Sequence, residues 1–250
     1  MTPATLRNLD DTRLRDVLLI ALTVSMGSLD AISYLGLGKV FSAFQTGNIV
    51  FLGLGTGGAS ASVARAGISL AAFGLGALIA TRIVLGPSPK HIWPRQVTVA
   101  LGGVTVSLLG FLVFWLLVNG RPSGTSADLL IAISALAAGM QTGAMLRLGV
   151  RAVFTTAATA TWTALMSDIA TDIAHRRAVD LARLAMVVVA AFGGAAAGAA
   201  LITGPRDVAP VVATALTALV TVTAAVRFEP ILRHPSSRRA ATESEARAPA

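Results

Sequence analysis

Residues 17–38 read VLLIALTVSMGSLDAISYLGLG, a run of 22 residues in which Asp30 is the only charged side chain. A helix of this length rises about 33 Å, enough to cross the roughly 30 Å hydrocarbon core of a bilayer. The run is also longer than the apolar core of a secretory signal peptide. We therefore expect a retained membrane-spanning helix with one carboxyl group deep inside it.

The rest of the chain has the same apolar character. Its 250 residues are 54% hydrophobic and 13% charged, with a mean hydropathy of +0.74, whereas soluble domains carry about a quarter charged residues. The chain has no cysteine, which excludes disulfides and cysteine-ligated metals. The formal net charge of +8 comes from basic residues between apolar segments and in the tail, a pattern typical of cytoplasmic loops. We expect a lipid bilayer as the partner and no nucleic acid.

Eight apolar segments follow one another along the chain, in two sets of four. The second set resembles the first, because Leu18-Leu19-Ile20-Ala21 recurs 111 positions later as Leu129-Leu130-Ile131-Ala132. The same shift relates Thr23 to Ser134 and Asp30 to Gln141, which predicts an internal duplication. The segments are 17–38, 41–58, 66–85 and 97–118 in the first set, and 128–146, 152–167, 181–203 and 208–226 in the second.

The basic residues indicate how many segments cross the membrane. If all eight cross, thirteen of the 20 basic residues lie on the N-terminal side. If 41–58 and 152–167 only dip into the bilayer, sixteen lie on that side, and the positive-inside rule favours this partition. Three crossings and one re-entrant segment in each half then force the halves into opposite orientations. The four basic residues left on the other side are Lys39, Arg65, Arg121 and Arg206.

The predicted fold is an all-α, polytopic membrane helix bundle of two inverted repeats. Residues 1–16 are expected to form a cytoplasmic N-terminal segment. Residues 17–227 form a single transmembrane domain, with repeat one at 17–118 and repeat two at 128–227. Residues 228–250 are rich in Pro, Ser, Ala and charge, a composition that indicates a disordered cytoplasmic tail.

Asp30 is the first candidate functional residue. It lies about 20 Å along its segment, where a carboxyl group costs a few kcal/mol and normally faces protein or a water-filled cavity. Thr23, Ser33 and Tyr34 share its helix face, and the second half has Gln141 at the equivalent position. Two interpretations stay open. Asp30 and its equivalent line a solute path, or Asp30 accepts hydrogen bonds from the backbone of the adjoining re-entrant segment.

The two re-entrant segments carry polar groups of their own. The first contains Gln45-Thr46-Gly47-Asn48, where glycine permits an unusual turn and its neighbours offer amide and hydroxyl groups. A helix break there would expose a half-helix terminus to a solute. In the second segment Thr155 and Thr159 lie on one helix face. Their hydroxyls line a constriction in the functional interpretation, and bond their own helix carbonyls in the structural one.

Several short stretches are distinctive as motifs: LDAISYLGLG at 29–38, TGNIVFLG at 46–53, Gly139-Met140-Gln141 and Val153-Phe154-Thr155-Thr156. They resemble the YoaK family of bacterial inner-membrane proteins, known as domain of unknown function 1275. The resemblance covers about residues 15–226. It implies six crossings and a multi-pass location in the bacterial plasma (inner) membrane, with both termini cytoplasmic by the charge argument. It implies no particular activity.

The leading functional hypothesis is a transporter or channel for an unknown small solute, with a site between the repeats near mid-membrane. Asp30 would take a proton or cation, or accept a hydrogen bond from the solute. The alternative is a non-transporting membrane protein that binds lipid or a partner protein. The residues predicted to bind substrate are Asp30, Tyr34, Gln45, Thr46, Gly47, Asn48, Gln141, Thr155 and Thr159.

Other functional classes find less support in the sequence. An enzyme is not expected, because no clustered carboxylates and no nucleophile–base pair are visible. No cofactor or metal is expected either, since the three histidines fall in loops or the tail, without the spacing of a metal site. Gly194 and Gly198 form a G-x-x-x-G pattern that we expect to pack inside the fold rather than to dimerise. A homo-oligomer remains open.

Overall fold

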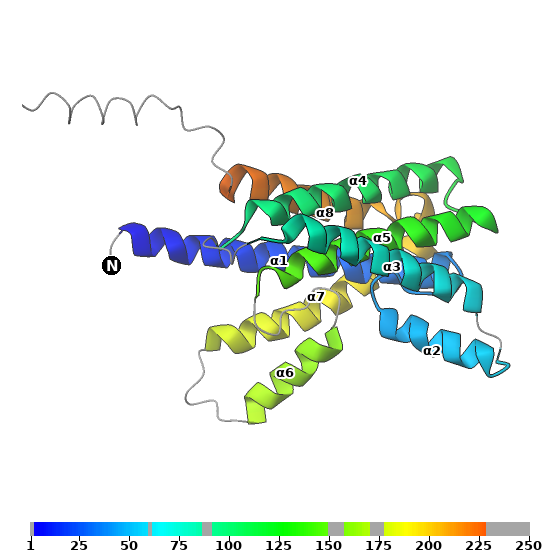
Figure 1. Cartoon of the computed structure of the whole chain (residues 1–250), viewed down its shortest axis with the longest axis horizontal. Helices are drawn as coiled ribbons and strands as arrows, with labels where there is room; N and C mark the ends of the chain where they lie inside the picture. Colours follow the sequence, from blue (N-terminus) through cyan, green and yellow to red (C-terminus); the bar gives the residue numbers. More distant parts are fainter. Residues whose placement is uncertain (1–2, 60–61, 87–91, 150–157, 171–177, 229–250) are drawn as a thin grey trace, which may run out of the picture.

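The computed structural model of the chain describes residues 3–59, 62–86, 92–149, 158–170 and 178–228. Within these ranges the chain forms eight α-helices, one short 3₁₀ turn (Arg206–Val208) and no strand, which confirms the predicted all-α bundle (Figure 1). The helices are α1 (Pro3–Gly36), α2 (Gln45–Thr56), α3 (Val63–Val84), α4 (Arg95–Leu117), α5 (Thr125–Leu146), α6 (Ala158–Ala170), α7 (Ala178–Thr203) and α8 (Val211–Phe228).

Six of the described helices are long and apolar enough to cross a bilayer. The two others, α2 and α6, have 12 and 13 residues and so rise only about 18 to 20 Å, well short of the hydrocarbon thickness. The structure thus agrees with six crossings and two short segments. The candidate spans are Asp10–Gly36, Val63–Val84, Arg95–Leu117, Thr125–Leu146, Leu181–Thr203 and Arg206–Phe228.

Three predicted boundaries differ from the structure. The first helix begins at Pro3, ahead of the apolar segment predicted to start at residue 17. Proline is well tolerated in the first turn of a helix, because the amide it lacks has no partner there. The first short helix begins at Gln45 rather than at 41, because residues 37–44 form a loop with positive φ angles at Gly38 and Lys39. The second short helix runs past the predicted end at 167, to Ala170.

Two helix pairs in the described part of the bundle make the most extensive contacts, α1 with α7 and α3 with α5. On α7, a Cβ added to Gly194 or Gly198 would collide with the backbone of Val24 or Ser28 on α1. The absent side chains therefore let the two helix backbones touch, as small residues do in membrane proteins. This confirms the expectation that the G-x-x-x-G pattern packs inside the fold.

The two ends of the bundle are defined by contacts between helix termini. Arg227 Nη2 at the end of α8 lies 2.9 Å from Asp11 Oδ1 near the start of α1, and Trp93, just before α4, stacks on Phe228. We call this the N-terminal end. At the opposite end Arg65 Nε of α3 lies 2.8 Å from Asp128 Oδ1 of α5. Helices α1, α4 and α7 run from the N-terminal end to the opposite end, and α3, α5 and α8 run back (Figure 1).

The outer surface of the bundle is strongly apolar. Large hydrophobic side chains stay exposed along several helices, among them Leu78 at 64%, Leu117 at 74% and Phe192 at 76%. In water such a surface would be costly, whereas lipid chains cover it without penalty. The fully buried side chains include Trp115, Phe111 and Leu22.

Candidate functional site

The start of α2 is held by a carboxylate from α1. Asp30 Oδ1 accepts the backbone N–H of Ser42 at 2.8 Å and that of Ala43 at 2.7 Å, in the loop that leads into α2. These amides precede the N-terminus of α2, where the helix dipole favours a negative charge. The structural interpretation of Asp30, a clamp on the backbone of the re-entrant segment, is therefore the arrangement present in the structure.

Asn48, in the first turn of α2, fixes the same loop from the other side. Its Oδ1 accepts the backbone N–H of Phe41 at 2.9 Å, and its Nδ2 donates to the carbonyl oxygen of Phe41 at 2.7 Å. Asn48 is fully buried. Both backbone groups of one loop residue are thus satisfied by a single side chain, as buried backbone requires.

Ser69 of α3 joins this arrangement. Its hydroxyl donates to the carbonyl oxygen of Phe41 at 2.6 Å and accepts from Gln45 Nε2 at 3.1 Å and Asn48 Nδ2 at 3.0 Å. Gln45 Nε2 also donates to the carbonyl oxygen of Ser42 at 2.8 Å. The first turn of α2, the loop before it and α3 are therefore joined through shared polar groups.

A serine pair extends the arrangement to the second half of the chain. Ser42 Oγ donates to Ser134 Oγ of α5 at 2.8 Å, and Ser134 Oγ donates to the carbonyl oxygen of Ile131 at 3.1 Å. Asp30 lies six residues before the end of α1 and Ser134 nine residues after the start of α5, about 9 and 14 Å from the opposite end. We call the following set the α2-start network: Asp30, Ser42, Gln45, Asn48, Ser69 and Ser134.

Two predicted site residues belong to an aromatic cluster beside this network. Tyr34 stacks on Phe41 with ring centroids 5.1 Å apart, and Phe41 contacts Phe44 edge-on at 5.2 Å. A Cβ at Gly47 would lie 2.8 Å from the ring of Phe41 and 2.9 Å from that of Phe44. Gly47 is therefore needed for packing, because only hydrogen fits against these rings. Thr46 is exposed, away from the network.

The predicted residues of the second half lie apart from the α2-start network. Gln141 is fully buried in α5, and its Nε2 donates to the carbonyl oxygen of Leu22 at 3.4 Å, seven residues or about 10 Å from Ser134 along the helix. Thr159 is exposed in the first turn of α6, where its carbonyl accepts a bond from Thr163 Oγ1 at 3.1 Å. Thr155 lies outside the described residues.

The structure thus brings together Asp30, Gln45 and Asn48 but adds three serines that sequence reasoning did not single out as site residues. A usable signal existed for one of them: Ser69 is the only polar residue between positions 66 and 80. For Ser134 the sequence indicates only that it is the repeat partner of Thr23. Nothing in the sequence distinguished Ser42, since its role depends on the way the loop folds back onto α1.

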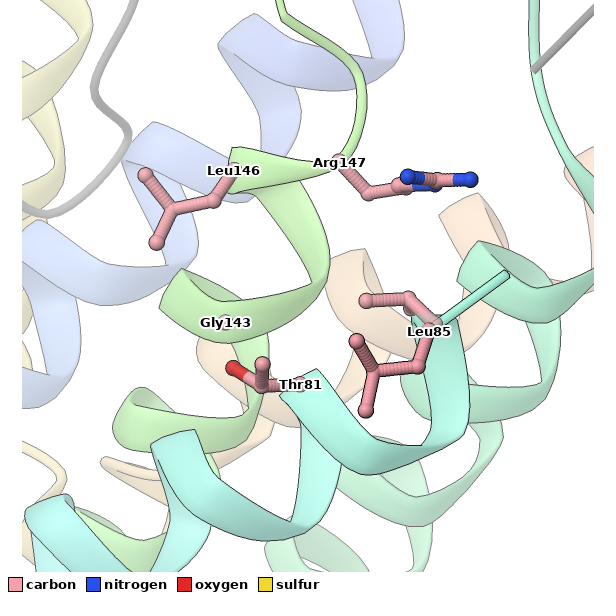
Figure 2. Close-up of a pocket in the computed structure, with 6 residues that line it drawn as sticks. Thr81, Leu85, Gly143, Leu146 and Arg147 are labelled. Atoms are coloured by element: carbon pink, nitrogen blue, oxygen red, sulfur yellow. The ribbon is translucent and has the colours of Figure 1, made fainter. Parts of the chain in front are cut away.

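The chemistry available at the network is that of hydrogen bonding around a single carboxylate. Across the described ranges, no group of three or more His, Cys, Asp or Glu is placed to hold a metal ion. Two surface pockets lie elsewhere. One of about 200 Å³ lies between the ends of α3 and α5 (Figure 2). The other, of about 530 Å³, is lined by Arg121, Ile202, Thr203, Gly204 and Arg206.

Comparison with known proteins assigns the chain to a family. Residues 18–223 match the family model described as "Protein of unknown function (DUF1275)". The chain is also 34% identical over 157 residues to the UPF0700 transmembrane protein YoaK of Bacillus subtilis (strain 168), a match that covers 62% of this chain and 67% of that protein. No solved structure matches. The family resemblance found in the sequence is confirmed, and the chain belongs to the DUF1275 family of multi-pass integral membrane proteins.

Proposed function

We propose that the protein is a transporter or channel for a small solute, which passes the start of α2 near mid-membrane. The observation that carries this proposal is the place where α2, only 12 residues long, begins. It begins at a polar network that lies about 9 to 14 Å into the bundle, measured from the opposite end. Irregular backbone at that depth is tolerated only where protein groups or a water-filled cavity satisfy it. Broken helices of this kind form the substrate sites of many transporters.

An inverted repeat is part of this proposal, and the helix packing supports it. Helix α1 packs on α7 and α5 packs on α3, so the first helix of each half contacts the third helix of the other. The short helices are also placed alike, since each packs on the third helix of its own half, α2 on α3 and α6 on α7. In Figure 1, α2 runs toward the opposite end and α6 toward the N-terminal end.

The crossing of α1 and α5 adds residue-level support. Ser134 of α5 bonds Ser42, which Asp30 of α1 also bonds. Gln141 of α5 bonds the carbonyl of Leu22, the neighbour of Thr23 on α1. The shift of 111 exchanges Asp30 with Gln141 and Thr23 with Ser134. Each of the two contacts thus links positions near a pair that the shift exchanges, which supports a two-fold axis between α1 and α5.

The charge distribution supports cytoplasmic termini in the bacterial inner membrane. Arg65 and Arg206 lie at the opposite end, where Arg65 pairs with Asp128 and Arg206 Nε donates to the carbonyl of Gly120 at 2.5 Å. Lys39 and Arg121 follow the ends of α1 and α4 at the same opposite end, whereas Arg15, Arg183 and Arg227 lie at the N-terminal end. A cytoplasmic N-terminal end then satisfies the positive-inside rule.

Within this proposal the network residues have different roles. Asp30 Oδ1 is engaged with two backbone amides, so we assign Asp30 to positioning the start of α2. Thr46 is exposed on the first turn of α2 and is the hydroxyl that a passing solute would meet. Solute contact at Thr46 and support by Asp30 can therefore be separated by mutation.

The test is flux into proteoliposomes that contain the full chain. The probes are light-scattering changes under gradients of urea and glycerol, and proton entry reported by pyranine. We expect protein-dependent flux of at least one probe, with a reduction in Thr46→Val and no change in Thr56→Val, the same substitution at the far end of the helix. Flux no greater than in protein-free liposomes for every probe, or equal flux in both variants, would count against the proposal.

A second candidate is a non-transporting membrane protein that binds lipid or a partner protein. One observation favours it: every polar side chain of the α2-start network has its hydrogen-bond partners within the protein, and neither of the two pockets described above is lined by network residues. This candidate predicts that Asp30→Asn lowers stability while flux stays at the protein-free level in all proteins compared.

A further inference from the structure

The pocket between α3 and α5 lies where both helices finish, at the N-terminal end of the bundle. Its volume is about 200 Å³. In Figure 2, the guanidinium of Arg147 extends beside Leu85 at the rim, with Leu146 on the other side and Thr81 farther along α3. The lining consists of Thr81, Val84, Leu85, Gly143, Leu146 and Arg147.

The pocket combines an apolar wall with a single cationic group. Leu85 and Leu146 are each 63% exposed, so the rim leaves hydrocarbon uncovered on both sides. Arg147 Nη2 donates to the carbonyl oxygen of Gly86 at 2.8 Å, which holds the guanidinium at the rim. A guanidinium offers five N–H donors in a planar fork, a geometry that suits phosphate oxygens.

Charged residues lie on both sides of this end of the molecule. Where α1, α7 and α8 meet, Arg183 lies 3.6 Å from Asp16, and Arg227 lies 2.9 Å from Asp11. The α3–α5 side differs, because the sequence has no Asp or Glu in residues 31–127 and none in 129–167. The arginines of this side are Arg82, Arg95 and Arg147.

We propose that the pocket binds an anionic phospholipid, with the headgroup phosphate on Arg147 and one acyl chain against Leu85 and Leu146. The acyl chain would continue past Thr81 and Gly143 onto the lipid-facing surface of α3, where Leu78 is 64% exposed. Free phosphate would use the guanidinium but leave the leucine walls in water, whereas a lipid satisfies both. Basic pockets between membrane helices are known sites for anionic headgroups. This proposal holds whether or not the protein moves a solute.

The experiment uses the full chain in nanodiscs with equal amounts of phosphatidylglycerol and phosphatidylcholine of matched acyl chains, followed by native mass spectrometry of the lipids that stay bound. The native protein should retain phosphatidylglycerol preferentially. Arg147→Gln should lower that preference by more than about fivefold, because diffuse attraction alone accounts for about that much per basic residue near an anionic surface. Thr81→Trp should lower retention of both lipids by filling the pocket, and Arg95→Gln should lower the preference by no more than the diffuse effect of about fivefold.

Three further outcomes decide the proposal. Arg147→Lys should keep more of the preference than Arg147→Gln, which also guards against a variant that fails to fold. Added inorganic phosphate should leave the bound lipid in place, and displacement by phosphate would show a simple anion site instead. Equal losses in Arg95→Gln and Arg147→Gln, or no preference in the native protein, would reduce the effect to diffuse attraction and overturn the proposal.

Discussion

Asp30 Oδ1 lies 2.7 Å from the backbone nitrogen of Ala43, thirteen residues farther along the chain, and accepts its hydrogen. This bond fixes the point at which the chain turns back from α1 into the short helix α2. In the bilayer interior an amide without a partner costs several kcal/mol, so a carboxylate that holds two amides at once has a clear structural use. The consequences can be tested by mutation.

Removal of the carboxylate should destabilise the fold more than its neutralisation. Asp30→Ala leaves the amides of Ser42 and Ala43 without their acceptor, and we expect the free energy of unfolding in mixed micelles to fall by about 3 kcal/mol. Asp30→Asn keeps an oxygen acceptor and should lose about 1 kcal/mol. Asp128→Asn, which removes one partner of a partly exposed ion pair, serves as the control and should cost less than about 1 kcal/mol. If the Asp30→Ala protein were as stable as the native one, the interpretation of Asp30 as a clamp on the start of α2 would be wrong.

Asn48 and Ser69 should act as a unit, because they bond each other and both bond the carbonyl oxygen of Phe41. In a double-mutant cycle of Asn48→Ala and Ser69→Ala, we expect a coupling energy of about 1 kcal/mol in unfolding. Ser107→Ala is the control, since Ser107 Oγ bonds only within its own helix, to the carbonyl of Gly103. Additivity of Asn48→Ala and Ser69→Ala within about 0.3 kcal/mol would show independent sites.

The sequence predicted the helices well because their signal is local. Runs of apolar residues of membrane length are read directly from composition, and all six candidate spans overlap predicted segments. Asp30 and Asn48 could also be identified, because a polar group in such a run needs a partner. Ser42 could not, since its role depends on a loop that brings position 42 to position 134. The sequence also could not predict that Asp30 belongs to the network while Gln141 lies apart from it. This difference depends on how far α1 and α5 are offset along their axes.

The close approach of α1 and α7 gives a matched pair of substitutions on one helix. Gly194→Ala places a Cβ against the backbone of Val24, and we expect a loss of about 1 to 3 kcal/mol in unfolding free energy. Gly193→Ala, at the adjacent position, adds a Cβ into open space and should stabilise the helix slightly, by about 0.5 to 1 kcal/mol. Thermal unfolding of the two variants in the same detergent measures the difference. Equal stability of the two would contradict the packing of α7 on α1.

We propose above all that α2 and α6 are re-entrant helices whose C-terminal ends face opposite sides of the membrane. The native chain has no cysteine, so single cysteines can be labelled without background. The most direct measurement is labelling of Ala59→Cys, just after α2, and Ala170→Cys, at the end of α6, with a membrane-impermeant maleimide in intact and permeabilised cells. We predict that position 59 reacts in intact cells and position 170 only after permeabilisation. Labelling of both positions only after permeabilisation would contradict the inverted arrangement and favour eight crossings with parallel repeats.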